Sequence, residues 1–451
     1  MKKIVAALLA VSMLLAITAC NKNSGSSPEV TDSPSSTTET EPVSGENDGL
    51  PVLSNPVKRT PDGEIDMTAA LSYTTDFDAL KAELSSREVD PAQPVSLNAR
   101  NNPSTMEVWN YLRSIYGKQM IAAQQQMDLS AVYEDKVYYL SANDLPAMKG
   151  FDFIFTTGSY QSRGMIDSAI EWAKQSGGLV TFTWHWNVPR DVDNEIGWAF
   201  YQEDIVNWDP LNATTPGTKE YEQAVHDIDL IAGYLQEMES NGVTVLFRPF
   251  HEASGSWFWW GLQPEHLKMI KNDEYPDIYQ RLWYMVFDRL ENYHKLSNII
   301  WVWNGQSKWC KVDPNSYDIS GIDYYANTET HEPLENKYKE LKSYTYDGKM
   351  LALSECGYIP DPALCAEQGI MWLYFMPWNG EFICESTESG TVIADIDGTP
   401  SPNPERITAE LLAQYFADEH LVSWNKLPEM SFGTKKIPEK ISVWDYFRAK
   451  D

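Results

Sequence analysis

The sequence predicts a (β/α)₈ TIM barrel, an α/β fold, formed by a single domain. Two observations support this prediction. Eight short apolar segments recur along the chain, and amphipathic segments with helical spacing separate most of them, as in parallel strands joined by crossover helices. Nearly every apolar segment also ends in polar or aromatic residues. Such residues are expected where the carboxyl ends of barrel strands assemble a site.

The repeating pattern begins after Leu97 and continues towards the C-terminus. The expected strands lie at 119–123, 151–156, 178–183, 243–247, 299–303, 318–321, 350–353 and 371–375. Helical spacing is found at 76–86, 107–116, 166–174, 220–241 and 278–296. A barrel domain over 97–451 is longer than the roughly 250 residues that are typical, which predicts enlarged loops.

The first 20 residues read as an export signal. Lys2 and Lys3 precede an apolar run that ends at Ile17 and is too short to span a bilayer. Small residues stand directly before Cys20 and resemble a bacterial lipobox, so we expect Cys20 to be lipidated and to become the mature N-terminus. The alternative is ordinary cleavage and free secretion. The expected location is therefore the extracellular face of a bacterial membrane, or the medium.

Residues 21–65 are assigned to a disordered linker. The segment is rich in Ser, Thr and Pro, and no aromatic residue occurs between Cys20 and Tyr73. A segment of this composition does not bury enough apolar surface to fold and acts as a flexible tether. Residues 66–96 are assigned to an N-terminal extension of the barrel.

Composition narrows the possible partners. The formal net charge of −30 argues against nucleic acids and anionic membrane surfaces, whereas a neutral polymer is compatible with it. The 17 Trp, 24 Tyr and 15 Phe residues exceed ordinary packing needs and suit the flat C–H faces of sugars. Four cysteines outside the signal have no zinc-type spacing and leave one or two disulfides open without indicating the pairing: Cys310, Cys356, Cys365 and Cys384.

The most informative segment follows the fourth expected strand. An Arg248-Pro249 pair ends the strand, and His251-Glu252 and the aromatic run 257–260 come directly after it. Burial against indole rings would raise the pKa of the Glu252 carboxyl and keep it protonated near neutral pH. Gly255 stands where a zinc protease needs its second His, so no metal is expected, and the chain has no P-loop or G-x-S-x-G motif.

A second carboxyl completes a candidate catalytic pair. Glu252 follows the fourth expected strand, and Glu355 follows the seventh, so a closed barrel brings the two face to face across its mouth. Retaining glycosidases need two carboxyls about 5–5.5 Å apart, one to protonate the leaving oxygen and one to attack the anomeric carbon. Taken alone, either Glu would be interpreted as a salt-bridge partner at the end of a strand. The pair among these aromatic residues favours catalysis.

These motifs resemble those of glycoside hydrolase family 26. The resemblance rests on residues 248–252 with Gly255, 257–261, Trp184-His185, 321–325 and 353–357. It implies a retaining (β/α)₈ enzyme, in most cases an endo-β-1,4-mannanase, that needs no metal or organic cofactor. It also implies that Glu252 is the proton donor and base and that Glu355 is the nucleophile.

The resemblance further implies a set of substrate-binding residues: His185, Trp186, Arg248, His251, Trp257, Tyr325 and Trp378. Within this set Tyr325 is expected to hydrogen-bond the nucleophile. Arg248 is expected to pair with Glu355 and to lower its pKa. Two departures from the family pattern, at Ala253-Ser254 and Cys356, concern the detail of the sugar subsites.

The sequence therefore predicts a monomeric endo-β-1,4-mannanase that hydrolyses mannan, glucomannan or galactomannan. It binds no nucleic acid and meets the membrane only through its lipid anchor. The same fold and mechanism also suit exo action with release of mannobiose, or action on mixed-linkage β-glucan or β-1,3-xylan. A sugar-binding lipoprotein is the alternative from another class, but it would have two lobes and no use for paired carboxyls.

Overall fold

Eight parallel strands close into a barrel in the computed structural model, which describes residues 54–127, 129, 132–158, 162–188, 199–202, 208–263 and 278–437. Neighbouring strands follow the order of the sequence, and β1 closes the ring because it pairs with both β2 and β8. The predicted (β/α)₈ fold is confirmed.

The strands match the predicted positions to within a few residues. They are β1 (Met120–Gln125), β2 (Met148–Asp152), β3 (Leu179–Trp184), β4 (Val245–Pro249), β5 (Ile299–Trp303), β6 (Ile319–Tyr324), β7 (Met350–Cys356) and β8 (Tyr374–Pro377). A two-residue strand, β9 (Leu421–Val422), pairs in parallel with the beginning of β1.

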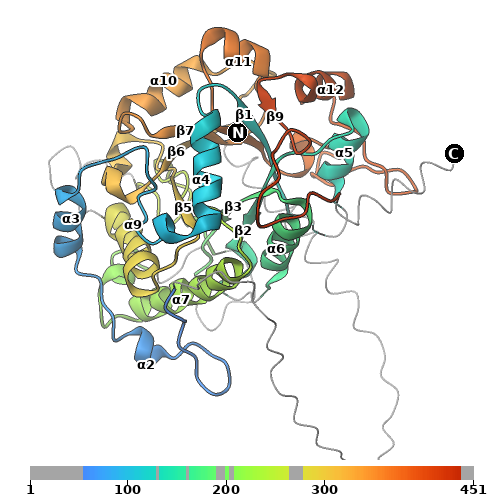
Figure 1. Ribbon diagram of the computed structural model, residues 1–451. Coiled ribbons are helices and arrows are strands. Elements are labelled where there is room, and N and C mark those ends of the chain that lie inside the picture. Colours follow the sequence, from blue (N-terminus) through green and yellow to red (C-terminus); the bar gives the residue numbers. More distant parts are fainter. Residues whose placement is uncertain are drawn as a thin grey trace, which may run out of the picture.

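Helices surround the barrel on its outer side (Figure 1). They are α2 (Met67–Ala70), α3 (Phe77–Ser86), α4 (Pro103–Ile115), α5 (Tyr133–Ala142), α6 (Gly164–Ser176), α7 (Lys219–Ser240), α9 (Ile278–Asp288), α10 (Glu335–Tyr344), α11 (Pro362–Gln368) and α12 (Ala409–Ala417). A π-helical turn, Arg289–Tyr293, extends α9. No helix was predicted where α2, α5, α10, α11 and α12 lie.

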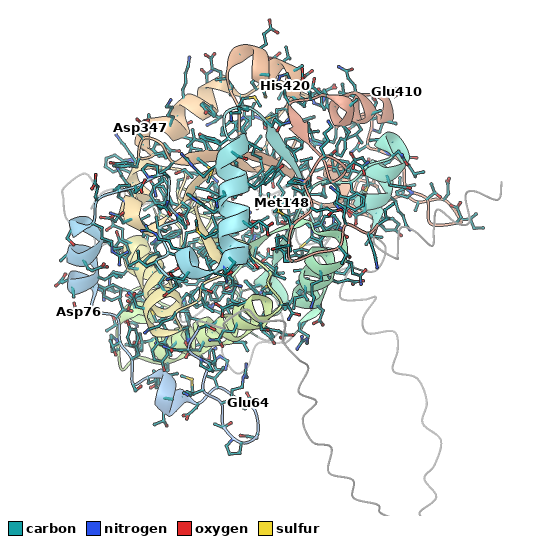
Figure 2. All side chains as sticks on the ribbon, viewed as in Figure 1. Glu64, Asp76, Met148, Asp347, Glu410 and His420 are labelled. Atoms are coloured by element: carbon teal, nitrogen blue, oxygen red, sulfur yellow. The ribbon has the colours of Figure 1, made fainter. Side chains whose placement is uncertain are left out.

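Helix α4 covers the amino-terminal end of the barrel, where it crosses the strands in Figure 1. It begins sharply because Asn102 accepts hydrogen bonds from the backbone of Ser104 and Thr105, with Pro103 at the first helical position. Its apolar face packs against buried residues of the barrel strands. One of them, Met148, is labelled in Figure 2. The carboxyl-terminal end is therefore left to form the site.

The predicted strand at 151–156 is wrong by three residues. β2 covers Met148–Asp152, and a 3₁₀ turn, Phe153–Phe155, follows it. The apolar residues of this region suggested a later start, because Lys149 and Gly150 interrupt the pattern. In the barrel, Lys149 lies on the outer face, and Gly150 faces inwards, where a Cβ atom would lie 2.5 Å from the Met376 sulfur.

The N-terminal extension begins earlier than predicted. The Asn55 N–H donates to the backbone oxygen of His294 (2.5 Å), and the Val57 N–H donates to Gln236 Oε1 (3.1 Å). Residues 54–65 therefore contact the helical layer, and the linker boundary placed at residue 65 lies too far along the chain. The expected signal and Cys20 lie outside the described residues.

The four cysteines of the barrel are buried and free: Cys310, Cys356, Cys365 and Cys384. The disulfides that the sequence left open are therefore not formed among them. Within the part of the chain that the structure describes, no helix is both long and apolar enough to cross a membrane.

Candidate active site

The turn after β4 aims Glu252 into the mouth of the barrel. β4 ends at Pro249, and Phe250 and Glu252 then adopt left-handed backbone angles, with φ of 54° and 53°. Such angles are unfavourable for residues with a side chain and persist only where the surroundings hold them. Here the Trp260 indole donates to the His251 backbone oxygen (2.8 Å), and the Ser254 N–H donates to Gly305 O (3.1 Å).

Glu252 is half-buried beside an aromatic platform. The Trp257 indole N–H donates to Glu252 Oε2 at 2.8 Å. Trp257 remains 36% exposed, whereas the neighbouring Trp259 and Trp260 are buried. Trp257 thus fixes the carboxyl and keeps part of its ring surface exposed.

Glu355 lies on β7, where an irregularity sets its direction. The register with β6 shifts so that Ile322 pairs with Leu353 but Asp323 pairs with Glu355, which leaves Ser354 as the extra residue. Glu355 points into the barrel mouth and is 4% exposed. Its two oxygens have different partners.

Two residues that the family resemblance placed beside Glu355 do contact it. The Tyr325 hydroxyl donates to Glu355 Oε2 at 2.7 Å. The buried Arg248 guanidinium forms an ion pair with Glu355 Oε1, and its other nitrogen lies 2.8 Å from Asp323 Oδ2. Arg248 also donates to the Thr183 hydroxyl (2.7 Å). Its position is therefore fixed from three sides.

The carboxyls of Glu252, Asp323 and Glu355 converge. One oxygen from each lies within 4.8 Å of one oxygen from the other two. This separation fits the roughly 5–5.5 Å between the carboxyls of retaining glycosidases better than the 6.5–9.5 Å of inverting ones. The Arg248 guanidinium supplies the positive charge between Asp323 and Glu355.

Burial and charge separate the two catalytic candidates. Burial raises the pKa of Glu252 well above its usual range, and the negative charges of Asp323 and Glu355 add to this. Burial also raises the pKa of Glu355, to about 7; Asp323 adds to the rise and Arg248 opposes it. Arg248 thus lowers the Glu355 pKa, as expected, but burial and Asp323 together outweigh the ion pair. Arg248 opposes the rise more directly at Glu355, with which it forms the ion pair, than at Glu252.

Two histidines lie beside the carboxyls. His185 follows β3, and its Nδ1 lies 2.5 Å from Asp152 Oδ2, while its backbone N–H donates to Asp152 Oδ1 (3.0 Å). The His251 ring packs edge-on against His185, with centroids 4.4 Å apart. Burial, His185 and Arg248 together lower the pKa of His251 well below normal, so its imidazole is neutral. Trp378 joins this group, with its ring 5.8 Å from that of His185.

Trp186 lies away from the group. Its ring stacks on Trp184 at 4.0 Å, and its indole N–H donates to Asp227 on α7 (2.8 Å). It is 1% exposed. Successive side chains point in opposite directions where a strand ends, so His185 faces the site and Trp186 faces the helical layer. This position does not support the sugar contact predicted for Trp186.

Sequence reasoning assigned no role to four further residues: Asp152, Asn304, Asp323 and Ser354. All four are buried at the ends of strands. Asn304 and Asp323 belong to polar segments that the sequence pattern did place at strand ends. Their partners come from other strands, and no local pattern indicates them.

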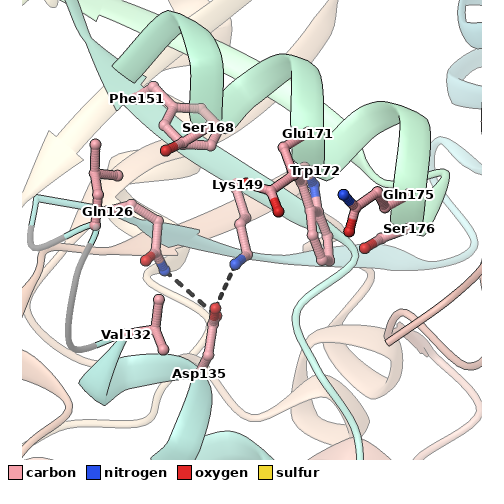
Figure 3. Close-up of a pocket in the computed structure, with 11 residues that line it drawn as sticks. Gln126, Val132, Asp135, Lys149, Phe151, Ser168, Glu171, Trp172, Gln175 and Ser176 are labelled. Carbon is pink, nitrogen blue, oxygen red and sulfur yellow. Dashed lines mark hydrogen bonds and ion pairs between the residues drawn. The ribbon is translucent and has the colours of Figure 1, made fainter. Parts of the chain in front are cut away.

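A separate hollow lies on the outer face of β2, between α5 and α6 (Figure 3). Buried Lys149 forms an ion pair there with Asp135, and the Lys149 ammonium lies 4.5 Å from the centre of the Trp172 ring. Asp135 also accepts a hydrogen bond from the Gln126 side chain (3.4 Å). Gly150, the next residue along β2, faces the barrel interior. The strand therefore separates this hollow from the carboxyls.

Comparison with known proteins decides the family. The family model described as "Glycosyl hydrolase family 26" matches residues 97–396. The chain belongs to glycosyl hydrolase family 26. The match covers all eight barrel strands and both catalytic candidates, so the family predicted from the sequence is confirmed.

Named relatives and solved structures agree with this assignment. The chain is 32% identical over 303 residues to mannan endo-1,4-β-mannosidase B of a Piromyces species, covering 65% of this chain and 50% of that protein. It is 33% identical over 294 residues to the mannan endo-1,4-β-mannosidase of Thermothelomyces thermophilus, covering 63% of this chain and 57% of that protein. The chain thus spans about half the length of these relatives.

Its fold is similar to that of a β-mannanase from a symbiotic protist of the termite Reticulitermes speratus, solved with a gluco-manno-oligosaccharide. That likeness has a TM-score of 0.62 and 26% identity, and it covers 75% of this chain and 98% of that one. The Podospora anserina β-(1,4)-mannanase is similar as well, with a TM-score of 0.61, 27% identity, and coverage of 76% and 70%.

Proposed function

We propose that this chain is a retaining endo-β-1,4-mannanase that hydrolyses mannan, glucomannan or galactomannan. The observation that carries the proposal is the close pair Glu252 and Glu355, whose oxygens lie within 4.8 Å and whose side-chain partners differ. The names of the family 26 relatives support mannan as the substrate.

The reaction proceeds in two displacements. Glu355 attacks the anomeric carbon and forms a covalent glycosyl ester, while Glu252 transfers its proton to the departing glycosidic oxygen. Glu252, now ionised, removes a proton from a water molecule that attacks the same carbon and releases Glu355. Each displacement inverts the anomeric carbon, so the product retains the β configuration.

The surrounding residues prepare the two carboxyls. Arg248 and Tyr325 each hold one oxygen of Glu355, which orients it for attack and stabilises its charge. Trp257 holds Glu252 and offers a face to the sugar beside the scissile bond. Neutral His251 and the His185–Asp152 pair supply polar contacts for the sugar hydroxyls.

Replacing the nucleophile tests the mechanism. We expect Glu355→Ala to lower hydrolysis of soluble mannan by at least about a thousandfold, because the covalent step is lost. Release of reducing ends measures this loss. The matched control Glu388→Gln changes an exposed carboxyl outside the cluster and should leave the rate unchanged. If Glu355→Ala, correctly folded, kept a tenth of the activity, the assignment would be wrong.

Product analysis tests the substrate and the mode of action. An endo-mannanase releases a ladder of manno-oligosaccharides from mannan, whereas an exo enzyme releases mannobiose alone. Mixed-linkage β-glucan and β-1,3-xylan should be poor substrates. Faster hydrolysis of either polymer than of mannan would contradict the proposed specificity.

We also propose that the protein is an exported monomer held at the outer face of a bacterial membrane by a lipid on Cys20. The small residues before that cysteine motivate the proposal. Cys20→Ser should move the protein from the membrane fraction to the medium. An unchanged distribution would contradict the lipid anchor.

A further inference from the structure

Asn304 stands directly after β5 and connects three strands. Its side chain is completely buried. Its Nδ2 donates to Asp323 Oδ1 (2.7 Å) on β6 and lies 2.6 Å from the Ser354 hydroxyl on β7. Its Oδ1 accepts from the backbone N–H of Glu252 (3.3 Å). A side-chain amide offers two donor hydrogens and one acceptor oxygen, and this one uses both functions.

The connection continues to the nucleophile. Asp323 accepts from Asn304 through Oδ1, and its other oxygen lies 2.8 Å from the Arg248 guanidinium. Arg248 in turn forms the ion pair with Glu355. The only buried amide in this chain of contacts thus joins the backbone of the acid to the cation that holds the nucleophile.

The turn that carries Glu252 depends on outside support. Left-handed angles at Phe250 and Glu252 store strain that neighbouring contacts must offset. Asn304 and the next residue, Gly305, provide two of these contacts, to the N–H groups of Glu252 and Ser254. The segment after β5 therefore holds the turn after β4 in place.

We propose that Asn304 is a positioning residue that ties the Glu252 turn to the Arg248–Asp323–Glu355 cluster and so keeps the two catalytic carboxyls at one separation. The inference rests on the proposed function and adds a residue to it. Asn304 acts through the Glu252 backbone and the Asp323 carboxylate, without touching the reacting atoms.

Three variants and a matched control separate positioning from simple support of the fold. Asn304→Ala removes all of the contacts. Asn304→Ser keeps a small polar group. Asn304→Asp keeps the oxygen that accepts from the Glu252 N–H but places a second negative charge beside the Asp323 carboxylate. The control is Asn298→Ala, which precedes the same strand at the other end of the barrel. Asn298 is also buried and donates two hydrogen bonds, to Leu235 O (2.9 Å) and Val243 O (3.0 Å).

The readouts are thermal unfolding, kcat and KM on a manno-oligosaccharide, and kcat on aryl glycosides with good and poor leaving groups. For Asn304→Ala we expect kcat to fall about 10- to 100-fold with KM within about twofold, because a misplacement near 1 Å has an effect of this size. The loss should be larger for poor leaving groups, which depend on proton donation. Asn304→Asp should also move both limbs of the pH profile upwards. Asn298→Ala should lower the melting temperature alone.

Two outcomes would overturn the inference while the proposed function stands. One is wild-type kcat in Asn304→Ala. The other is a loss of kcat in Asn304→Ala that is equal on good and poor leaving groups. If Asn304→Ala does not fold, Asn304→Ser and Asn304→Asp decide by the same readouts. Failure of the wild-type enzyme on every β-mannan would instead overturn the proposed function, and the inference with it.

Discussion

Glu252 and Glu355 are chemically identical side chains that the barrel places in different surroundings. Glu252 has the Trp257 indole as its side-chain donor, whereas Glu355 has a tyrosine hydroxyl and an arginine. The pKa values of both carboxyls rise, but Arg248 and His185 restrain the rise at Glu355. The surroundings of Glu252 therefore favour its protonated form, whereas Arg248 favours the charged form of Glu355, as the proposed acid and nucleophile require.

The pH profile should respond to the third carboxyl. The acidic limb reports ionisation of Glu355, whose pKa is about 7, and the alkaline limb reports loss of the Glu252 proton. Because the charge of Asp323 raises both pKa values, Asp323→Asn should move both limbs to lower pH. The dependence of kcat/KM on pH measures this. A shift of either limb to higher pH would contradict the role given to Asp323.

Glu252 should also lower stability at high pH. Folding raises the pKa of this carboxyl. Such a group destabilises the native state as the pH rises from the pKa of the unfolded chain, about 4.3, through the pKa of the folded protein. Below the pKa of the unfolded chain the carboxyl is protonated in both states and does not change the stability. Glu252→Gln should therefore raise the melting temperature at about pH 8 and leave it nearly unchanged at about pH 4. Glu388→Gln, at an exposed site, should show no such contrast.

At the scale of elements, inward-facing glycines show how tightly the barrel is filled. A Cβ atom at Gly150 would lie 2.4 Å from Gln125 Oε1 and 2.5 Å from the Met376 sulfur. Gly150→Val should lower the free energy of unfolding by about 1–3 kcal/mol, because the filled interior must shift. Denaturant titration measures the change. Gly164→Ala, where the nearest atom is 3.4 Å away, is the matched control and should have little effect.

The same strand explains an error in the sequence prediction. Periodicity marks where apolar residues cluster, and for β2 it favoured the aromatic residues of 153–155 over Lys149 and Gly150. Pairing with β3 extends from Met148 to Asp152 and determines the real strand. Buried Lys149 is tolerated there because its ammonium forms an ion pair with Asp135 and a cation–π contact with the Trp172 ring.

At the scale of the whole molecule, the N-terminal extension is bound into the helical layer. Tyr73 stacks on Tyr293 with centroids 4.7 Å apart, and Arg289 donates to the backbone of Ala70 and Tyr73. Near the end of the extension, Ser96 donates to Glu291 at 2.7 Å, and the same carboxyl accepts from Trp301 on β5. The extension therefore connects to the barrel wall.

A chain that begins at residue 97 should be much less stable. Three apolar residues of the extension, Leu80, Leu84 and Val95, are buried, and burial of each such side chain contributes about 1.5–3 kcal/mol. We expect a loss of several kcal/mol, measured by denaturant titration against the full chain. Leu84→Ala alone should cost about 2–5 kcal/mol. An equally stable truncated chain would show that the extension only rests on the surface.

Much of the fold and part of the site could be predicted from the sequence alone. Alternating strand and helix patterns indicated eight parallel strands, and residues at strand ends indicated Glu252 and Glu355. These features depend on local periodicity and on a property of every barrel, namely that its carboxyl strand ends meet at one face.

Only the tertiary structure decided the rest. It turned Trp186 towards α7 and His185 towards the site. It also brought Asp323 beside Glu355 through the irregularity between β6 and β7 and joined Asn304 to the Glu252 backbone. It also buried Glu355 beside Asp323, and these two effects on the Glu355 pKa outweigh that of Arg248. The physical reason is the same in each case: orientation, burial and charge depend on residues that are distant in the sequence and meet only when the barrel closes.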